Sequence, residues 1–144
     1  MQKNLPNKWI RKAVYEAIDG MVVDGYSIPC FDTYVSGANQ PDFYTILSTQ
    51  TSSVDKNNKC EYFWNSTINI EAVTYYPRPG LPGTKLMANN MIDKIRELTN
   101  DLLLDAQSQL EIFVQTQDFP NGLSISTEHE NIFREFISIT FRVR

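Results

Sequence analysis

The chain has 144 residues, the length of one domain, and its 42% hydrophobic and 21% charged residues are ordinary for a folded globular protein. Its 13 basic and 17 acidic side chains give a net charge of −4, which argues against a dedicated duplex binder, because such proteins need a basic surface. One histidine and two cysteines are too few for an ordinary structural zinc site. We therefore expect a single domain over residues 1–144, with no metal and no cofactor.

The two cysteines, Cys30 and Cys60, do not form a CxxC pair, and the start of the chain lacks the apolar stretch of a signal peptide. We expect both to be reduced, and at least one to be buried as a small apolar residue. No apolar run approaches the roughly 20 residues that cross a bilayer. These features predict a soluble, intracellular protein with no membrane partner.

Two amphipathic helices are predicted from apolar residues that recur three and four positions apart. The first begins at Asn7, a candidate N-cap, and runs for about three turns, with Gly20 and Gly25 as candidate stop signals. Thr84 is the candidate cap of the second. The apolar faces consist of Ile10, Val14, Ile18 and Met21 in the first helix, and of Met87, Met91, Ile95, Leu98 and Leu102 in the second.

Five strands are predicted from β-branched and aromatic residues and from period-two alternation. They cover 27–35, 43–51, 62–76, 110–116 and 132–144, and Pro29 indicates an edge strand or a strand start. The polar segment 52–59 is expected to be a hairpin loop, and the proline- and glycine-rich segment 77–83 to be irregular. The order α-β-β-β-α-β-β indicates an α+β fold. We expect a small, twisted, mainly antiparallel sheet that packs against two helices, with the first three strands as a meander.

The sequence contains no recognisable catalytic signature. His129 lies between Glu128 and Glu130 and could act as a general base, but a solvated loop residue is more typical of such a polar stretch. We expect no enzymatic activity. A small enzyme built around these three residues remains an alternative, which requires His129 to lie in a concave pocket.

Two regions carry candidate protein-interface residues. One is the proline-rich loop and the strand before it, which is either a rigid contact point or an ordinary linker. The other is the last strand, where alternation places three arginines on one face, either for docking or as its solvated side. The candidates are Tyr75, Tyr76, Arg78 and Leu81 in the first region, and Arg134, Arg142 and Arg144 in the second.

Aromatic residues also gather around the third predicted strand, among them Tyr62, Phe63 and Trp64. Core and subunit packing explain them most simply. On a sheet face they could instead stack bases, so a single-stranded nucleic-acid-binding α+β module is the alternative function.

The order of elements and several segments resemble the tail terminator, or tail completion, proteins of tailed bacteriophages. The resemblance covers nearly the whole chain and rests on the segments 9–15, 41–47, 67–72, 89–98 and 133–144. It includes the opening amphipathic helix that carries Trp9, the proline-aromatic-hydrophobic strand and the final strand with its arginines. The loops at 52–59 and 77–83 are longer than the usual connections of that family.

This resemblance implies a structural virion protein that forms a ring at the head–tail junction. The ring, sixfold or else twelvefold, would consist of copies of this chain in head-to-tail contact. Its partners would be the portal-side connector or adaptor proteins and the tail tube protein. Genome DNA could pass through the ring without sequence-specific contact. The protein would assemble in the bacterial cytoplasm and reside in the virion, at the tail or the head–tail joint.

Overall fold

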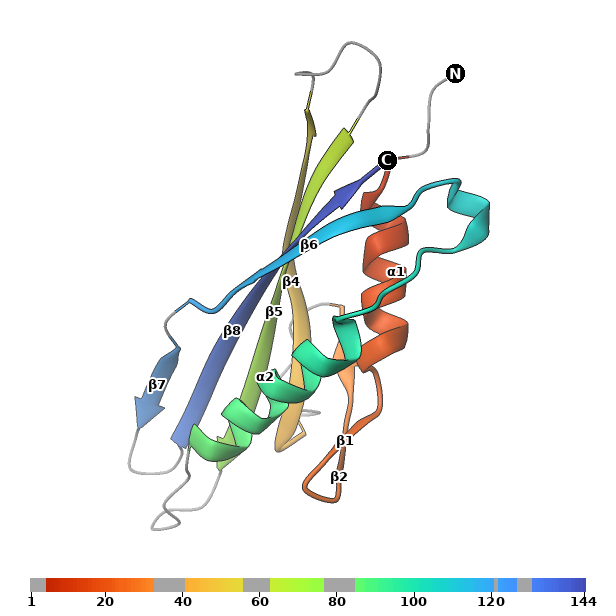
Figure 1. Ribbon diagram of the computed structural model, residues 1–144. Helices are drawn as coiled ribbons and strands as arrows, with labels where there is room; N and C mark the ends of the chain where they lie inside the picture. Colours follow the sequence, from red (N-terminus) through yellow and green to blue (C-terminus); the bar gives the residue numbers. More distant parts are fainter. Residues whose placement is uncertain (1–4, 33–40, 56–62, 77–84, 121, 127–130) are drawn as a thin grey trace.

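A computed structural model describes residues 5–32, 41–55, 63–76, 85–120, 122–126 and 131–144 (Figure 1). Its main sheet has six strands in the order β3-β4-β5-β8-β6, with β7 also paired to β8. Two helices, α1 and α2, pack on one face of this sheet, and a separate two-stranded sheet lies beside them. The predicted α+β class, with a mainly antiparallel sheet packed against two helices, is confirmed.

Helix α1 spans Asn7–Ile18 and buries Ile10, Val14 and Ile18, as predicted. The expected N-cap, Asn7, is wrong, because Pro6 occupies that position with a helical φ of −74°. Its carbonyl oxygen accepts the Ile10 N–H at 2.9 Å. Proline suits a helix start because its ring holds φ near the helical value. Asn7 therefore lies inside the helix, where its backbone oxygen accepts the Gln50 side chain at 2.8 Å and ties α1 to β4.

A β-hairpin follows α1 where the prediction continued the apolar face of the helix to Met21. Strands β1 (Met21–Val23) and β2 (Tyr26–Ile28) pair antiparallel, and their turn is formed by Asp24 and Gly25. Both turn residues have positive φ, 50° and 84°. An Asp-Gly pair suits such a two-residue turn, because aspartate tolerates and glycine favours this conformation. The hairpin therefore replaces the last predicted helical turn.

The predicted strand 27–35 divides at Pro29 into β2 and a two-residue strand, β3 (Cys30–Phe31), and its last residues, 33–35, lie outside the described part of the chain. β3 pairs parallel with β4, so the expected antiparallel meander of the first three strands is wrong at this step. The Pro29 carbonyl accepts the Thr45 N–H at 3.0 Å, and proline itself has no N–H to donate. β3 is nevertheless an edge strand, as the proline indicated.

Three long strands form the body of the sheet: β4 (Phe43–Asp55), β5 (Phe63–Tyr76) and β8 (Asn131–Val143). β5 lies between β4 and β8 and pairs antiparallel with both. The expected loop over 52–59 is wrong at 52–55, because β4 continues to Asp55, and residues 56–59 lie outside the described part of the chain. The last residues of β4 are rich in serine and threonine, whose hydroxyl groups suit a partly solvated strand as well as a loop.

Helix α2 (Lys85–Thr99) connects β5 to the second half of the sheet, and Thr84, its predicted cap, lies outside the described residues. A short 3-10 helix, η2 (Ala106–Ser108), and strand β6 (Ile112–Asp118) follow. The prediction missed β7 (Leu123–Ser126), which pairs with the first residues of β8. In the described part of the chain, neither helix is long and apolar enough to cross a membrane.

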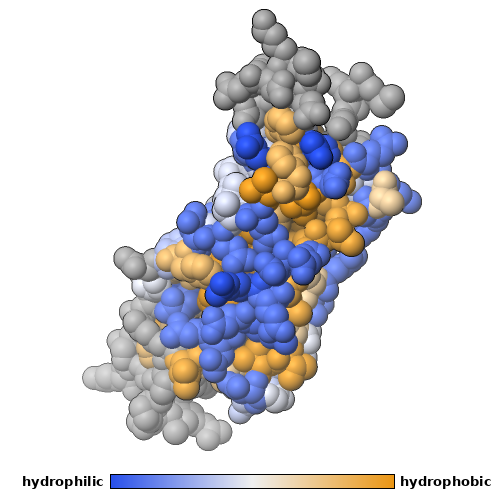
Figure 2. All heavy atoms as spheres, in the orientation of Figure 1, coloured by the Kyte–Doolittle hydropathy of each residue, from blue (hydrophilic) through white to orange (hydrophobic). Residues whose placement is uncertain are grey.

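The core lies between the two helices and one face of the sheet. The predicted apolar stripes of both helices contribute to it, together with alternate residues of β5 and β8. The opposite side of α2 forms the mostly hydrophilic centre of Figure 2, and apolar atoms gather above it, where Figure 1 places α1 and the start of β6. The principal buried residues are Ile10, Val14, Ile18, Ile68, Ile70, Met91, Ile95, Ile137, Ile139 and Phe141.

Candidate functional site

Of the three predicted arginines, Arg134 and Arg142 belong to β8 and lie on the sheet face opposite the helices, and Arg144 directly follows the strand. Ile137, Ile139, Phe141 and Val143 are buried toward the core, so alternation turns the even-numbered residues to the other side. Arg134 and Arg142 are eight residues apart, which is about 27 Å along a strand. The predicted stripe therefore consists of two separate sites, one at each end of β8.

At the C-terminal end of β8, two arginines lie over two phenylalanines. The Arg142 guanidinium is 5.4 Å from the ring centre of Phe63 and 5.8 Å from that of Phe113. Arg144 is 5.1 Å from the Phe113 ring, and the two rings are 5.1 Å apart. Cation–π contacts of this kind contribute about 0.5–1 kcal/mol each at exposed sites. We call these four residues the Arg–Phe cluster.

The Arg–Phe cluster joins the ends of three strands, because Phe63 begins β5 and Phe113 lies in the first part of β6. Val114, opposite Arg142 in the sheet, is 44% exposed and adds apolar surface beside the cluster. A surface that mixes arginine, aromatic and apolar groups is typical of protein interfaces. Phe113 was not among the predicted interface residues, because its contact with Arg142 depends on how β6 pairs with β8.

At the other end of β8, Arg134 forms an ion pair with Glu71 of β5, with Nη1 2.9 Å from Oε2. The Glu71 side chain is only 10% exposed, and the Arg134 side chain 24%. Glu71 is the direct β-sheet partner of Ile46, which belongs to a small apolar cluster with Tyr44 and Val73. The Arg134 guanidinium is therefore paired within the chain. A carboxylate in the otherwise apolar run from Ile70 to Val73 was the sequence signal for such a partner.

The loop-side candidates are only partly described. Tyr75 lies half-buried in β5, where its backbone N–H donates to the Asp42 oxygen at 2.7 Å. The backbone of Tyr76 pairs with that of Asn131. Arg78, Leu81 and the 77–83 loop lie outside the described residues, as do Glu128, His129 and Glu130. Their proposed roles remain predictions.

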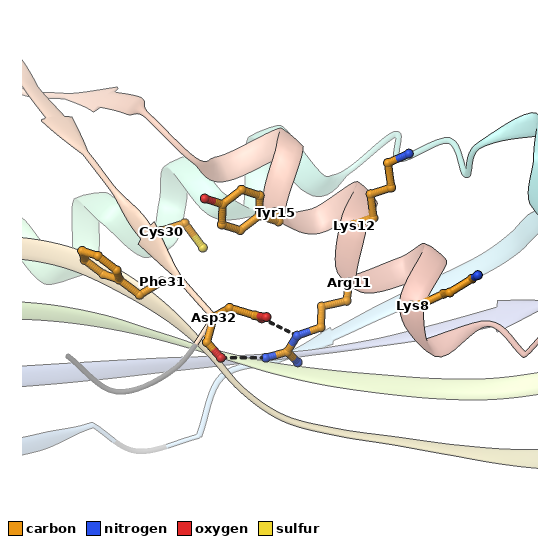
Figure 3. A pocket seen from close by; sticks show the side chains of 7 residues that line it. All are labelled: Lys8, Arg11, Lys12, Tyr15, Cys30, Phe31 and Asp32. Atoms are coloured by element: carbon orange, nitrogen blue, oxygen red, sulfur yellow. Dashed lines mark hydrogen bonds and ion pairs between the residues drawn. The ribbon is translucent and has the colours of Figure 1, made fainter.

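A shallow pocket of about 450 Å³ lies between α1 and β3 (Figure 3). Arg11 crosses it and binds the Asp32 carboxylate and backbone, and its Nη2 also donates to the Leu47 oxygen at 3.0 Å. Lys12 points away from this pair, and its Nζ reaches Asp105 at 3.1 Å. These contacts join α1 to the residue after β3, to β4 and to the residue before η2. The lining residues are Lys8, Arg11, Lys12, Tyr15, Cys30, Phe31 and Asp32.

Cys30 is a buried, free thiol that lines this pocket, which confirms the expectation of at least one buried cysteine. Burial raises its pKa from 9.0 to about 11, because the surroundings disfavour the thiolate. The folded chain keeps the thiol proton at pH values where the unfolded chain has lost it. The contribution of this group to stability is therefore lost as pH rises from 9.0 to about 11.

The raised pKa predicts slow chemistry at Cys30. In a Cys60→Ser variant, where Cys30 is the one remaining thiol, we expect slow reaction with a disulfide reagent such as DTNB at pH 8, since about one thiol in a thousand is ionised. The rate should rise roughly tenfold per pH unit toward pH 10. The same variant in urea serves as control and should react as an ordinary thiol. Equal rates in the folded and unfolded chain would contradict the prediction.

Comparison with known proteins supplies a structural match. No protein-family model matches the chain, and no curated protein matches it in sequence. Among solved structures, a chain described as "Virion of native gene transfer agent (GTA) particle" superposes with a TM-score of 0.59 at 12% sequence identity. The alignment covers 94% of this chain and 96% of that one. This protein therefore shares its fold, over nearly its whole length, with a chain of that virion particle.

Proposed function

We propose that this chain is a structural virion protein that forms a ring at the head–tail junction of a tailed bacteriophage or related particle. It ends the tail tube, or joins the tail to the portal-side connector, through protein contacts and without bond chemistry or a cofactor. The observation that carries the proposal is the fold shared along almost the entire length with a virion chain. The resemblance of the sequence to tail terminators supports the proposed position at the head–tail junction.

Two features of the surface support a role in assembly. The Arg–Phe cluster offers charge and aromatic area at one end of the sheet, next to the exposed Val114. The long strands also extend the sheet past α1 at the top of Figure 1, so β4 and β5 form an arm beyond the helical layer. Both features are available to neighbouring subunits or to an adjoining ring.

Immunogold labelling of particles from the host that encodes this chain tests the position. Antibodies against the purified chain should label intact or partly disrupted particles where head meets tail. Labelling confined to the capsid shell or the tail tip would contradict the junction role. Detection of the chain in cell lysate but not in purified particles, by mass spectrometry, would contradict a virion protein altogether.

Single-stranded nucleic-acid binding is the second candidate, because the Arg–Phe cluster brings arginine and aromatic rings together on an open sheet face. The phenylalanine rings, however, already contact arginine side chains and each other. We expect fluorescence anisotropy with a labelled oligothymidine to show no saturable binding at 0.15 M salt. Affinity that falls steeply with added salt, and is lost in Arg142→Ala, would favour nucleic-acid binding instead.

A further inference from the structure

At one end of the main sheet, neither edge pairs with a further strand among the described residues. On one side, β3 pairs with β4 only at Thr45 and Ile46, so no described strand covers the outer side of β4 over 49–54. On the other side, β6 is the last strand, and no strand in the described part of the chain pairs with its outer side. A four-stranded section of the sheet lies between these edges. It consists of residues 50–55 of β4, the first part of β5, the end of β8, and β6.

Over residues 50–54 of β4 and 114–117 of β6, the two edges contain no charged residue, no proline and no register shift. Proteins commonly block exposed edges with charges, proline or a β-bulge. The segments 49–54 and 112–117 contain no charged residue and no proline. The irregularities in the two strands lie between Leu47 and Gln50 and between Ile112 and Val114. The segments 50–54 and 114–117 therefore keep a regular register and are suited to pair with another strand.

The two edges match each other row by row. Thr51 pairs with Thr67, Thr67 with Thr140, and Thr140 with Thr116, so one row contains a threonine from each of the four strands. The inner pair is hydrogen-bonded, with Oγ1 atoms 2.9 Å apart. Thr51 and Thr116 are exposed at the ends of this row. The adjacent row ends in glutamine on both sides, at Gln50 and Gln117.

Strand direction also favours contact between the two edges. All neighbours in the four-stranded section are antiparallel, so β4 and β6 run in opposite directions. When β6 of one subunit lies beside β4 of the next in the same orientation, the antiparallel pattern continues across the boundary. Cross-strand threonine pairs stabilise neighbouring strands.

We propose that subunits join head to tail by pairing β6 of one copy with β4 of the next, with Thr116 opposite Thr51 and Gln117 opposite Gln50. The inference rests on the ring of the proposed function and identifies its subunit contact. Because two different edges meet, the contact repeats from subunit to subunit and can close into a ring.

Charge substitutions at the two row ends test this pairing. Native mass spectrometry compares the wild type with Thr51→Lys/Thr116→Lys, in which like charges meet, and with Thr51→Lys/Thr116→Glu, in which opposite charges meet. We expect loss of the ring in the first variant and its recovery in the second. Asn89→Lys/Asn100→Lys is the control, because it adds the same two charges at exposed positions away from both edges. Asn89 lies in α2 and Asn100 directly follows it, so this variant should keep the ring.

The outcomes separate this pairing from the ring itself. A ring that persists in Thr51→Lys/Thr116→Lys overturns the edge pairing and leaves the proposed function intact. A wild-type chain that stays monomeric at every concentration overturns the ring, and the pairing with it. If the chain forms a ring only when another virion protein is added, the two edges are assigned to that protein and not to a second copy of this chain.

Disulfide cross-linking gives an independent measurement if the lysine variant fails to fold. Two double variants in a Cys60→Ser background place a cysteine pair in two adjacent rows: Thr51→Cys/Thr116→Cys and Ser52→Cys/Gln115→Cys. Both rows are needed because hydrogen-bonded and non-hydrogen-bonded pairs alternate along antiparallel strands. Mild oxidation should link one of these variants into a ladder of many chains. Equal mixtures of the two corresponding single variants should stop at dimers. Absence of cross-linking in both pairs overturns the proposal.

Discussion

Replacing Arg134 with methionine is expected to destabilise the protein by about 3–5 kcal/mol, because it leaves a buried carboxylate without its partner. Glu71 is 10% exposed and lies 2.9 Å from the guanidinium in the folded chain. Its sheet partner on β4, Ile46, is fully buried and cannot replace the lost hydrogen bond. Urea unfolding followed by circular dichroism measures the change in the free energy of unfolding.

A second variant distinguishes the unpaired charge from simple loss of packing. Glu71→Leu/Arg134→Met removes both charges and should recover most of the lost stability, since apolar residues of similar size often replace a buried ion pair without loss. Lys94→Met is the matched control. It breaks an exposed pair with Glu97, 3.7 Å apart, and should change the stability very little. If Arg134→Met and Lys94→Met unfold alike, Arg134 is free to serve as an interface charge.

The strongly periodic parts of the fold follow from local sequence. The stripe from Met87 to Leu98 predicts α2, and alternation around Ile139 predicts which face of β8 is buried, because both patterns repeat the geometry of one element. The Asp24-Gly25 pair is a typical hairpin turn, but the apolar spacing of α1 continues to Met21 and favours a longer helix instead. A three-residue strand offers too few repeats to decide such a competition.

Local sequence patterns do not determine which distant segments pair with each other. The parallel contact of Cys30 with Thr45 interrupts the expected meander, although each strand looks the same from its own sequence. The same holds for the candidate site, where the face of the arginines was predictable and their partners were not. The shared face of the three arginines was predicted, but their partners Glu71 and Phe113 depend on the registers of β5 and β6 against β8. A shift by one residue would place different partners beside each arginine.

Adjacent residues of β8 provide a direct test of that register, because their side chains point to opposite faces of the sheet. Phe141 is fully buried beneath the helices and is among the largest fully buried side chains.

We expect Phe141→Ala to lower the free energy of unfolding by about 3–5 kcal/mol, through lost burial and the cavity it leaves. Thr140→Ala, on the opposite face, should cost about 1 kcal/mol, because it removes one hydrogen bond to Thr67. Denaturant unfolding of both variants measures the difference. A larger loss in Thr140→Ala than in Phe141→Ala would mean that β8 presents its other face to the core. The threonine row could then not extend across the open face from one subunit to the next.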